Sequence, residues 1–245
     1  MKTALFIAPE TDRHAAPVAE RLREAGAEVI FLDIADWSRR NCQAALRSGL
    51  DAIHLELSVD GRRIEPSDIG YVWIRRISPP RIPQSKDECD RENCLRETEA
   101  FIFGIFHLFT DFCRSNFKFA DKHFIESKVI QQHLSNKCGL SSPYTLITNS
   151  RESITTSWSG GDRLIAKPLV HTFWESDDGG VTTLAPVEIA RTDIQDDELK
   201  VFPLIFQDFI PTRKDIRAVR VGDEVIAFRI NCERRTVDWK DYNKE

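Results

Sequence analysis

Apolar and polar positions near the start of the chain predict a βαβ-like opening. Residues 3–8 form an apolar run that is typical of a buried strand. Residues 14–25 then place apolar side chains at helical spacing and end at Gly26, a common helix stop. Residues 28–33 predict a second strand.

Two further patterns extend this first region. Residues 53–59 alternate apolar and polar side chains ahead of Asp60-Gly61, a pair that is typical of a tight hairpin turn. Residues 71–74 predict another strand, and residues 87–112 predict a long helix with a periodic apolar face. These elements indicate a first domain over residues 1–120.

The second half of the chain is richer in strands. A helix is expected over residues 126–138, before Gly139. Strands are expected at 144–148, 163–167, 181–184, 202–207, 215–221 and 225–231. Mostly hairpin-connected strands after an α/β region indicate the α+β class, a mixed α/β fold, with a second domain over residues 121–245.

The turn after the first strand argues against a dinucleotide site. It reads Ala8-Pro9-Glu10-Thr11-Asp12 and lacks the GxGxxG pattern. Those glycines are what allow a pyrophosphate to approach the backbone. A Rossmann cofactor site is therefore not expected.

Composition and charge fit an ordinary globular protein. The 245 residues are 41% hydrophobic and 30% charged, with 34 basic and 39 acidic residues and a net charge of −5. This balance predicts no nucleic-acid partner, which would require a concentrated basic excess. The N-terminus lacks a signal-peptide pattern and no run approaches the ~20 apolar residues of a membrane span, so we expect a cytoplasmic protein without a membrane partner.

The six cysteines predict no zinc site. They stand at positions 42, 89, 94, 113, 138 and 232, without a CxxC pair. Zinc sites built from cysteines usually show two closely spaced pairs. We expect the cysteines to be reduced and structural, and the sequence assigns no metal ligand.

Three segments carry candidate chemistry. Lys167 ends an apolar strand and precedes Pro168, a position from which its charge could meet nucleotide phosphates, although this position taken alone favours an ordinary surface lysine. The loop 175–180 contains two glycines, which free the backbone to fold over phosphates, but its acidic residues weaken that interpretation.

The third segment is an apolar strand that runs into a linker at 207–210. Such a linker is expected to leave backbone groups free for the edge of an adenine. In the strand that follows, Asp215 and Arg217 share one face because side chains alternate. Within an apolar sheet this pair would be costly to bury without a polar ligand, whereas on an exposed face it would be an ordinary ion pair.

Together these segments resemble the ATP-grasp superfamily, and most closely the graspetide maturases, the microviridin-type ligases of ribosomally made peptides. The resembling segments follow the family order along the chain: Val72 to Arg76, Glu126 to Gln131, Cys138 to Asn149, Lys167-Pro168, Gln207 to Ile210, the strand of Asp215 and Arg217, and Thr236 to Lys240. The resemblance implies an ATP-grasp fold with a βαβ-type pre-ATP-grasp domain, a central subdomain at about 121–205 and a partial C-terminal subdomain at about 206–245.

The resemblance also implies roles for individual residues. Lys128 and Lys167 would contact the nucleotide phosphates. The hinge that recognises adenine, largely through backbone groups, would be Gln207, Asp208, Phe209 and Ile210.

A second set of residues would act near the transferred group. Arg217 would stabilise charge on the phosphoryl or acyl phosphate, with Asp215 beside it in the nucleotide site. Asp238 and Lys240 match a family segment that ends in Asp-Trp-Arg at the reaction centre, with lysine replacing the bidentate arginine. Arg75 and Arg76 would support the N-terminal domain or its peptide contacts.

The implied activity is ATP-dependent ligation within a precursor peptide. ATP would phosphorylate an aspartate or glutamate side chain, and a hydroxyl or amine of the same peptide would then form an ester or amide. The cofactors implied are ATP and Mg²⁺. The implied partner is a precursor peptide with its leader, and the resemblance also suggests a homodimer.

One part of the family pattern is missing. The family's Glu-x-Asn magnesium ligands do not occur after residue 207, and the chain ends at Glu245. The sequence therefore favours a truncated enzyme over a shortened, catalytically silent relative that binds a leader peptide or a partner ligase. A third alternative keeps the enzyme but changes the chemistry to glutamate-adding or glutathione-type ligation.

Overall fold

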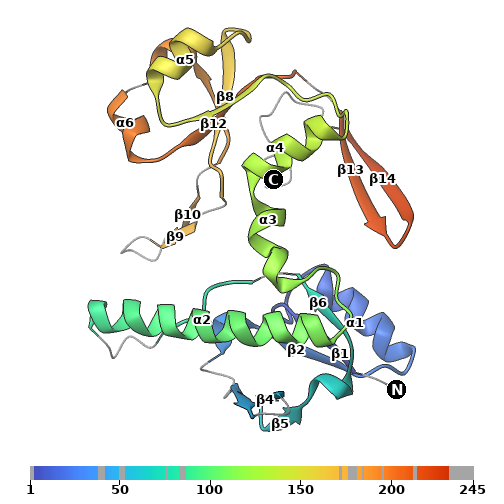
Figure 1. Ribbon diagram of the computed structural model, residues 1–245. Coiled ribbons are helices and arrows are strands. Elements are labelled where there is room, and N and C mark those ends of the chain that lie inside the picture. The colour runs from blue at the N-terminus through green and yellow to red at the C-terminus, as the bar shows by residue number, and fades with distance from the viewer. Residues whose placement is uncertain are drawn as a thin grey trace. The chain divides into compact units, whose positions relative to one another are not determined.

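The computed structural model describes residues 3–37, 42–49, 53–75, 77–82, 87–170, 173–175, 181–183, 185–194, 196–211 and 214–231. The chain divides into two compact units (Figure 1), unit 1 over residues 1–124 and unit 2 over residues 125–245. Helix α3 (Lys122–Glu126) crosses the boundary between them.

Unit 1 is an α/β structure with two sheets. In chain order its elements are β1 (Thr3–Ile7), α1 (Ala15–Glu24), β2 (Val29–Leu32), η1 (Ile34–Asp36), β3 (Gln43–Ser48), β4 (Ile53–Val59), β5 (Arg62–Ile64), η2 (Pro66–Asp68), β6 (Ile69–Ile74), α2 (Glu88–Phe112) and η3 (Phe119–Asp121). Strands β2-β1-β6 form a parallel sheet in that order, and β3-β4-β5 form an antiparallel one.

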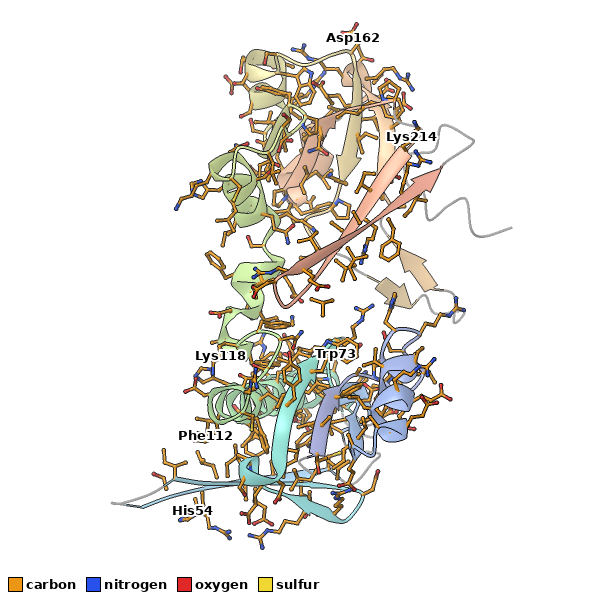
Figure 2. All side chains as sticks on the ribbon, turned by 90° about the vertical axis from the view of Figure 1, so that its right-hand side faces the viewer. His54, Trp73, Phe112, Lys118, Asp162 and Lys214 are labelled. Carbon is orange, nitrogen blue, oxygen red and sulfur yellow. The ribbon has the colours of Figure 1, made fainter. Side chains whose placement is uncertain are left out.

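The parallel sheet is covered on both faces by helices, which lie on opposite sides of it in Figures 1 and 2. Strand β1 alternates between two cores: Phe6 packs with the alanines of α1, whereas Leu5 and Ile7 pack with the apolar face of α2. Trp73 of β6 (Figure 2) meets Phe6 edge to face at 4.8 Å between ring centroids. The sequence predictions of the βαβ opening, the hairpin that turns at Asp60-Gly61 and the long helix are confirmed.

The outer edge of β6 is covered by the segment after α2. The Val72 N–H donates to the Arg114 carbonyl at 2.7 Å, and the Ile74 N–H donates to the Asn116 side-chain oxygen at 2.9 Å. Asn116 also donates back to the Ile74 carbonyl at 2.8 Å. These bonds satisfy backbone groups that an open edge would leave unpaired.

Unit 2 contains a four-stranded antiparallel sheet, two further strand pairs and short helices. Its elements are α4 (Lys128–Lys137), β7 (Thr145–Thr148), α5 (Arg151–Ser157), β8 (Arg163–Lys167), β9 (Phe173–Glu175), β10 (Val181–Thr183), β11 (Val187–Ala190), η4 (Arg191–Asp193), α6 (Asp196–Val201), β12 (Leu204–Asp208), β13 (Lys214–Val221) and β14 (Glu224–Asn231). The expected helix 126–138 begins only at Lys128, because Ser127 caps it by accepting from the Ile130 N–H.

The expectation of mostly hairpin-connected strands is wrong for the main sheet of unit 2. Its strand order is β11-β8-β12-β7, with every neighbouring pair antiparallel. Strands β7 and β8 are joined through α5, and β12 enters between them from later in the chain. The two other strand pairs of unit 2, β9-β10 and β13-β14, are antiparallel, and β13 and β14 correspond to the strands expected at 215–221 and 225–231.

Candidate functional site

The main sheet of unit 2 has one apolar face and one face that carries polar side chains. Leu164 and Ala166 of β8 and Phe206 of β12 pack into a core with residues of α5 and α6. Because side chains alternate along a strand, the residues between them lie on the opposite face. This second face, here called the lysine face, carries Thr145, Ile147, Ile165, Lys167, Ile205 and Gln207.

A chain of hydrogen bonds runs across the lysine face. Gln207 stands directly between Thr145 and Ile165 on the neighbouring strands, so Lys167 is its diagonal neighbour. The Lys167 ammonium donates to Gln207 Oε1 at 2.7 Å, and Gln207 Nε2 donates to Thr145 Oγ1 at 2.7 Å. Thr145 Oγ1 donates in turn to the Pro143 carbonyl at 2.9 Å. All three side chains are half-buried.

Helix α4 contributes a second ammonium group. Lys128 is the first residue of α4, directly after the capping Ser127, and its ammonium donates to Gln131 Oε1 at 3.1 Å. Burial lowers the pKa of Lys167 below the ordinary 10.5, and the nearby positive charge of Lys128 lowers that pKa further. Two neighbouring ammonium groups repel each other, so an anion bound between them would relieve the repulsion. The site is therefore suited to phosphate groups.

The hinge residues after Gln207 are already held by the protein. The Asp208 N–H donates to the Tyr144 carbonyl at 3.0 Å, and the Phe209 N–H donates to the Arg163 carbonyl at 3.2 Å. The expectation that this segment leaves its backbone N–H groups free is wrong for these two, because both extend the pairing of β12. Ile210 follows them and is exposed.

The Asp208 carboxylate holds the loop between α5 and β8. Its Oδ1 accepts from the Gly161 N–H at 2.8 Å. A Cβ on Gly160 would lie only 2.2 Å from that same oxygen, so glycine is required at position 160 for this approach. The Asp208 side chain therefore fixes this loop, a role that differs from the adenine contact expected of the hinge.

Aromatic side chains complete the attachment of this loop. The Trp158 indole N–H donates to the Gly161 carbonyl at 2.9 Å. Tyr144 packs edge-on against Trp158, with 4.8 Å between the ring centroids. The Arg163 guanidinium lies 4.3 Å from the centre of the Phe209 ring and pairs with Glu188. The hinge and loop 158–163 therefore form one packed structure.

Asp215 and Arg217 lie on a hairpin rather than in a buried sheet. They share a face of β13, opposite Ile230 and Phe228 of β14. Arg217 is exposed, as are Val219, Ile226 and Phe228 on the same face. The hairpin therefore does not bury the Asp215 and Arg217 side chains in an apolar sheet, so the free-energy cost considered for that case does not apply within it.

Some predicted site residues lie outside the described residues. These are Asp238 and Lys240 at the expected reaction centre, Arg76, and positions 176–180 of the glycine loop. Arg75 is described: its Nε lies 3.6 Å from Oδ1 of the buried Asp12. The same oxygen also accepts from the backbone N–H groups of His14 and Ala15 at the start of α1.

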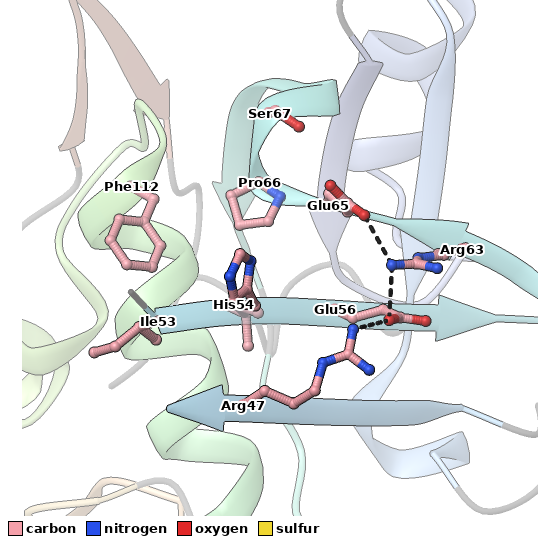
Figure 3. A pocket seen from close by; sticks show the side chains of 10 residues that line it. Arg47, Ile53, His54, Glu56, Arg63, Glu65, Pro66, Ser67 and Phe112 are labelled. Atoms are coloured by element: carbon pink, nitrogen blue, oxygen red, sulfur yellow. Dashed lines mark hydrogen bonds and ion pairs between the residues drawn. The ribbon is translucent and has the colours of Figure 1, made fainter. Parts of the chain in front are cut away.

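Unit 1 has a separate cavity of about 270 Å³ (Figure 3). Glu56 pairs there with Arg47 at 3.3 Å and with Arg63 at 3.0 Å, while Arg63 also pairs with Glu65. Because these charges neutralise one another, the cavity has no excess charge that would select an ionic ligand.

Two further features concern metals and membranes. Among the described residues, no group of three or more histidine, cysteine, aspartate or glutamate side chains could hold a metal ion. Within the same part of the chain, no helix is both long and apolar enough to cross a membrane.

Comparison with known proteins identifies the N-terminal region first. Residues 3–118 match the family model of the MvdD pre-ATP grasp domain. No curated protein sequence matches the chain.

Solved structures match nearly the whole chain. A RiPP-associated ATP-grasp ligase from Chryseobacterium gregarium, in complex with ADP and a leader and core peptide, has a TM-score of 0.81 and 22% identity, covering 99% of this chain and 74% of the ligase. The macrocyclase MdnC of Microcystis aeruginosa MRC, bound with precursor peptide MdnA, has a TM-score of 0.79 and 19% identity over 95% of this chain and 76% of its own. The macrocyclase MdnB from the same organism has a TM-score of 0.76 and 22% identity over 99% of this chain and 80% of its own.

These matches confirm the resemblance and the fold expected from the sequence. At 19–22% identity the solved structures establish a shared fold, and the family model covers the N-terminal region. Residues 3–118 match the pre-ATP-grasp family model, and the chain shares the ATP-grasp fold of these solved structures.

Proposed function

We propose that this chain is an ATP-dependent carboxylate ligase that cross-links a ribosomally made precursor peptide. The observation that carries the proposal is the half-buried Lys167 ammonium on the lysine face, held by Gln207 at 2.7 Å, with the positive charge of Lys128 near enough to lower its pKa. This lysine belongs to a fold that the chain shares with a ligase bound to ADP and peptide. An anionic nucleotide would neutralise this pair, and the half-buried position of Lys167 would strengthen the attraction.

The reaction would proceed in two balanced steps. A carboxylate oxygen of a peptide aspartate or glutamate attacks the γ-phosphorus of ATP, ADP leaves, and an acyl phosphate forms. A hydroxyl or amine of the peptide then attacks the carbonyl carbon, loses its proton, and expels inorganic phosphate to give an ester or amide. In this scheme the two lysines hold and neutralise phosphates, which is the main contribution a protein makes to phosphoryl transfer.

Other assignments belong to the same proposal. Arg217, Asp215, Asp238 and Lys240 would act near the transferred phosphoryl, and Gln207 to Ile210 would lie along the nucleotide. Mg²⁺ would supply charge neutralisation at the phosphates, while its protein ligands are not assigned to any described residue. The subdomains at about 121–205 and 206–245, the leader-bearing precursor peptide, a homodimer and a cytoplasmic location complete the proposal.

Calorimetric titration with ATP and Mg²⁺ tests the nucleotide site. Replacing either lysine, as Lys128→Met or Lys167→Met, should weaken binding at least tenfold, which corresponds to about 1.4 kcal/mol. Lys137→Met is the matched control, because this exposed lysine lies in the last turn of the same helix α4. The proposal fails if the folded chain does not bind ATP, or if all three variants bind as the unaltered chain does.

A peptide assay then separates the ligase from its alternatives. Release of ADP that depends on a leader-bearing peptide with acidic and hydroxyl side chains, with loss of one water per ring, supports cross-linking. Nucleotide binding without any such product supports a silent relative, and product formed from free glutamate supports the glutamate-adding alternative.

A further inference from the structure

We infer that Gln207 is a positioning residue, anchored by Thr145, that holds the Lys167 ammonium in place on the lysine face. The inference rests on the proposed function, because a fixed Lys167 matters for a bound nucleotide. It differs from the hinge role that the sequence suggests for Gln207, which would use backbone groups.

The direction of the Gln207 amide follows from the donors around it. A lysine ammonium can only donate, so the group facing it at 2.7 Å must be the amide oxygen. Thr145 has one hydroxyl proton, which it donates to the Pro143 carbonyl, so toward Gln207 it can only accept. The amide nitrogen consequently faces Thr145, and both ends of the amide are fixed by chemistry.

This arrangement links three strands that are distant in sequence. Gln207 is 40 residues from Lys167 and 62 residues from Thr145. Its amide oxygen stabilises the charged form of a lysine that burial and Lys128 both destabilise. Without it, Lys167 would lose both a hydrogen-bond partner and the group that sets the direction of its side chain.

The Gln207 side chain is well placed for this task. Its strand β12 lies between β7 and β8, so a side chain at this position can reach both neighbours at once. A half-buried amide that makes one bond on each side has little rotamer freedom, and that rigidity passes to the lysine. Thr145 contributes indirectly, through its bond to a backbone carbonyl.

The first test measures the pKa of Lys167 by NMR in the nucleotide-free protein. Gln207→Leu should lower that pKa below its value in the unaltered chain, and Thr145→Val should lower it by a smaller amount. Gln207→Glu should raise it instead, because a carboxylate would replace a neutral acceptor. Gln132→Leu serves as control, because it removes a glutamine from helix α4 at a position outside the hydrogen-bond chain.

The second test measures ATP binding for the same variants. Gln207→Leu should weaken ATP at least fivefold at neutral pH and more strongly as the pH rises, whereas a purely structural loss would weaken it equally at every pH. Gln207→Glu should weaken ATP even though it raises the lysine pKa, since it adds negative charge beside the phosphates.

The two proposals fail in different ways. An unchanged Lys167 pKa in folded Gln207→Leu protein would overturn the positioning role, even if ATP binds the unaltered chain well. An unaltered chain that does not bind ATP would overturn the proposed function, while a shifted Lys167 pKa in Gln207→Leu would still support the positioning of Lys167 by Gln207.

Discussion

Replacing Gly160 with alanine would force a methyl group against the Asp208 carboxylate. The new Cβ would lie 2.2 Å from Oδ1 and 2.7 Å from Cγ of Asp208, and 2.8 Å from Cζ2 of Trp158. All three distances are well inside van der Waals contact, which for two carbon atoms is about 3.5–4.0 Å. The loop or the carboxylate must therefore move.

Either movement has a recognisable cost. Overpacking of this kind destabilises by about 1–3 kcal/mol. If Asp208 turns away instead, the bond from the Gly161 N–H to its carboxylate is lost, and a hydrogen bond to a charged group contributes about 1.5–3 kcal/mol. Alanine also reduces the conformational entropy of the unfolded chain, which offsets about 0.4–1 kcal/mol of this destabilisation. We therefore expect the free energy of unfolding to fall by about 1–2 kcal/mol.

The adjacent glycine provides the control. A Cβ on Gly161 would have its nearest neighbour, Asp208 Oδ1, at 3.9 Å, which is ordinary contact. Gly161→Ala should therefore not destabilise the chain, and the restriction of the unfolded state should stabilise it by up to about 0.4–1 kcal/mol. Urea unfolding and hydrogen exchange at the Gly161 amide measure the global and the local effect.

A double-mutant cycle identifies the clash itself. In an Asp208→Ala background, Gly160→Ala should cost clearly less than it does alone, because two of the three close contacts are gone. Equal stability of Gly160→Ala and Gly161→Ala, or the same cost in both backgrounds, would refute the packing of this loop against the hinge.

Three further predictions concern charge and capping. Because the lowered pKa of Lys167 allows its ammonium to lose a proton below pH 10.5, ATP affinity should fall as the pH approaches that value, and Lys167→Arg should abolish the fall. Hydrogen bonds from Arg62 and then Thr3 lower the pKa of Glu28 from 4.5 to about 2, so the stability they contribute is present above pH 4.5 and lost as the pH falls through about 2. A carbon-13 NMR titration should show this pKa returning toward 4.5 in Arg62→Gln. Ser127→Ala should destabilise helix α4 by about 1 kcal/mol, measured by urea unfolding, and weaken ATP binding, measured by calorimetry. An unchanged ATP affinity would show that the cap does not determine the position of Lys128.

Several elements could be predicted because their signals are local. The Asp60-Gly61 turn was predictable, since both residues adopt positive φ, 51° and 79°, which this residue pair tolerates. Strand β8 was predicted with its observed bounds, because its apolar run ends at Lys167-Pro168. Strand β3 and helix α5 were missed: β3 is mostly exposed and lacks alternation, and α5 is a single short helix of polar residues.

The candidate site was predictable only in its residue types. Lys167 was a candidate from its position at the end of an apolar strand, Lys128 and the hinge role of Gln207 came from family resemblance, and Thr145 was noted only as part of a strand. The loop contact of Asp208 had one signal in the sequence, the pair Gly160-Gly161, but nothing local connects that pair to a residue 47 positions later.

The sequence by itself determined strands with a strong apolar pattern, such as β8, and tight turns such as Asp60-Gly61, because these depend on neighbours a few residues apart. Only the tertiary structure decided that β12 enters between β7 and β8. That insertion brings Thr145, Lys167 and Gln207 onto one face and into hydrogen-bond contact. Strand order is set by which apolar faces pack together across the whole unit, and a pattern along the chain does not contain that information.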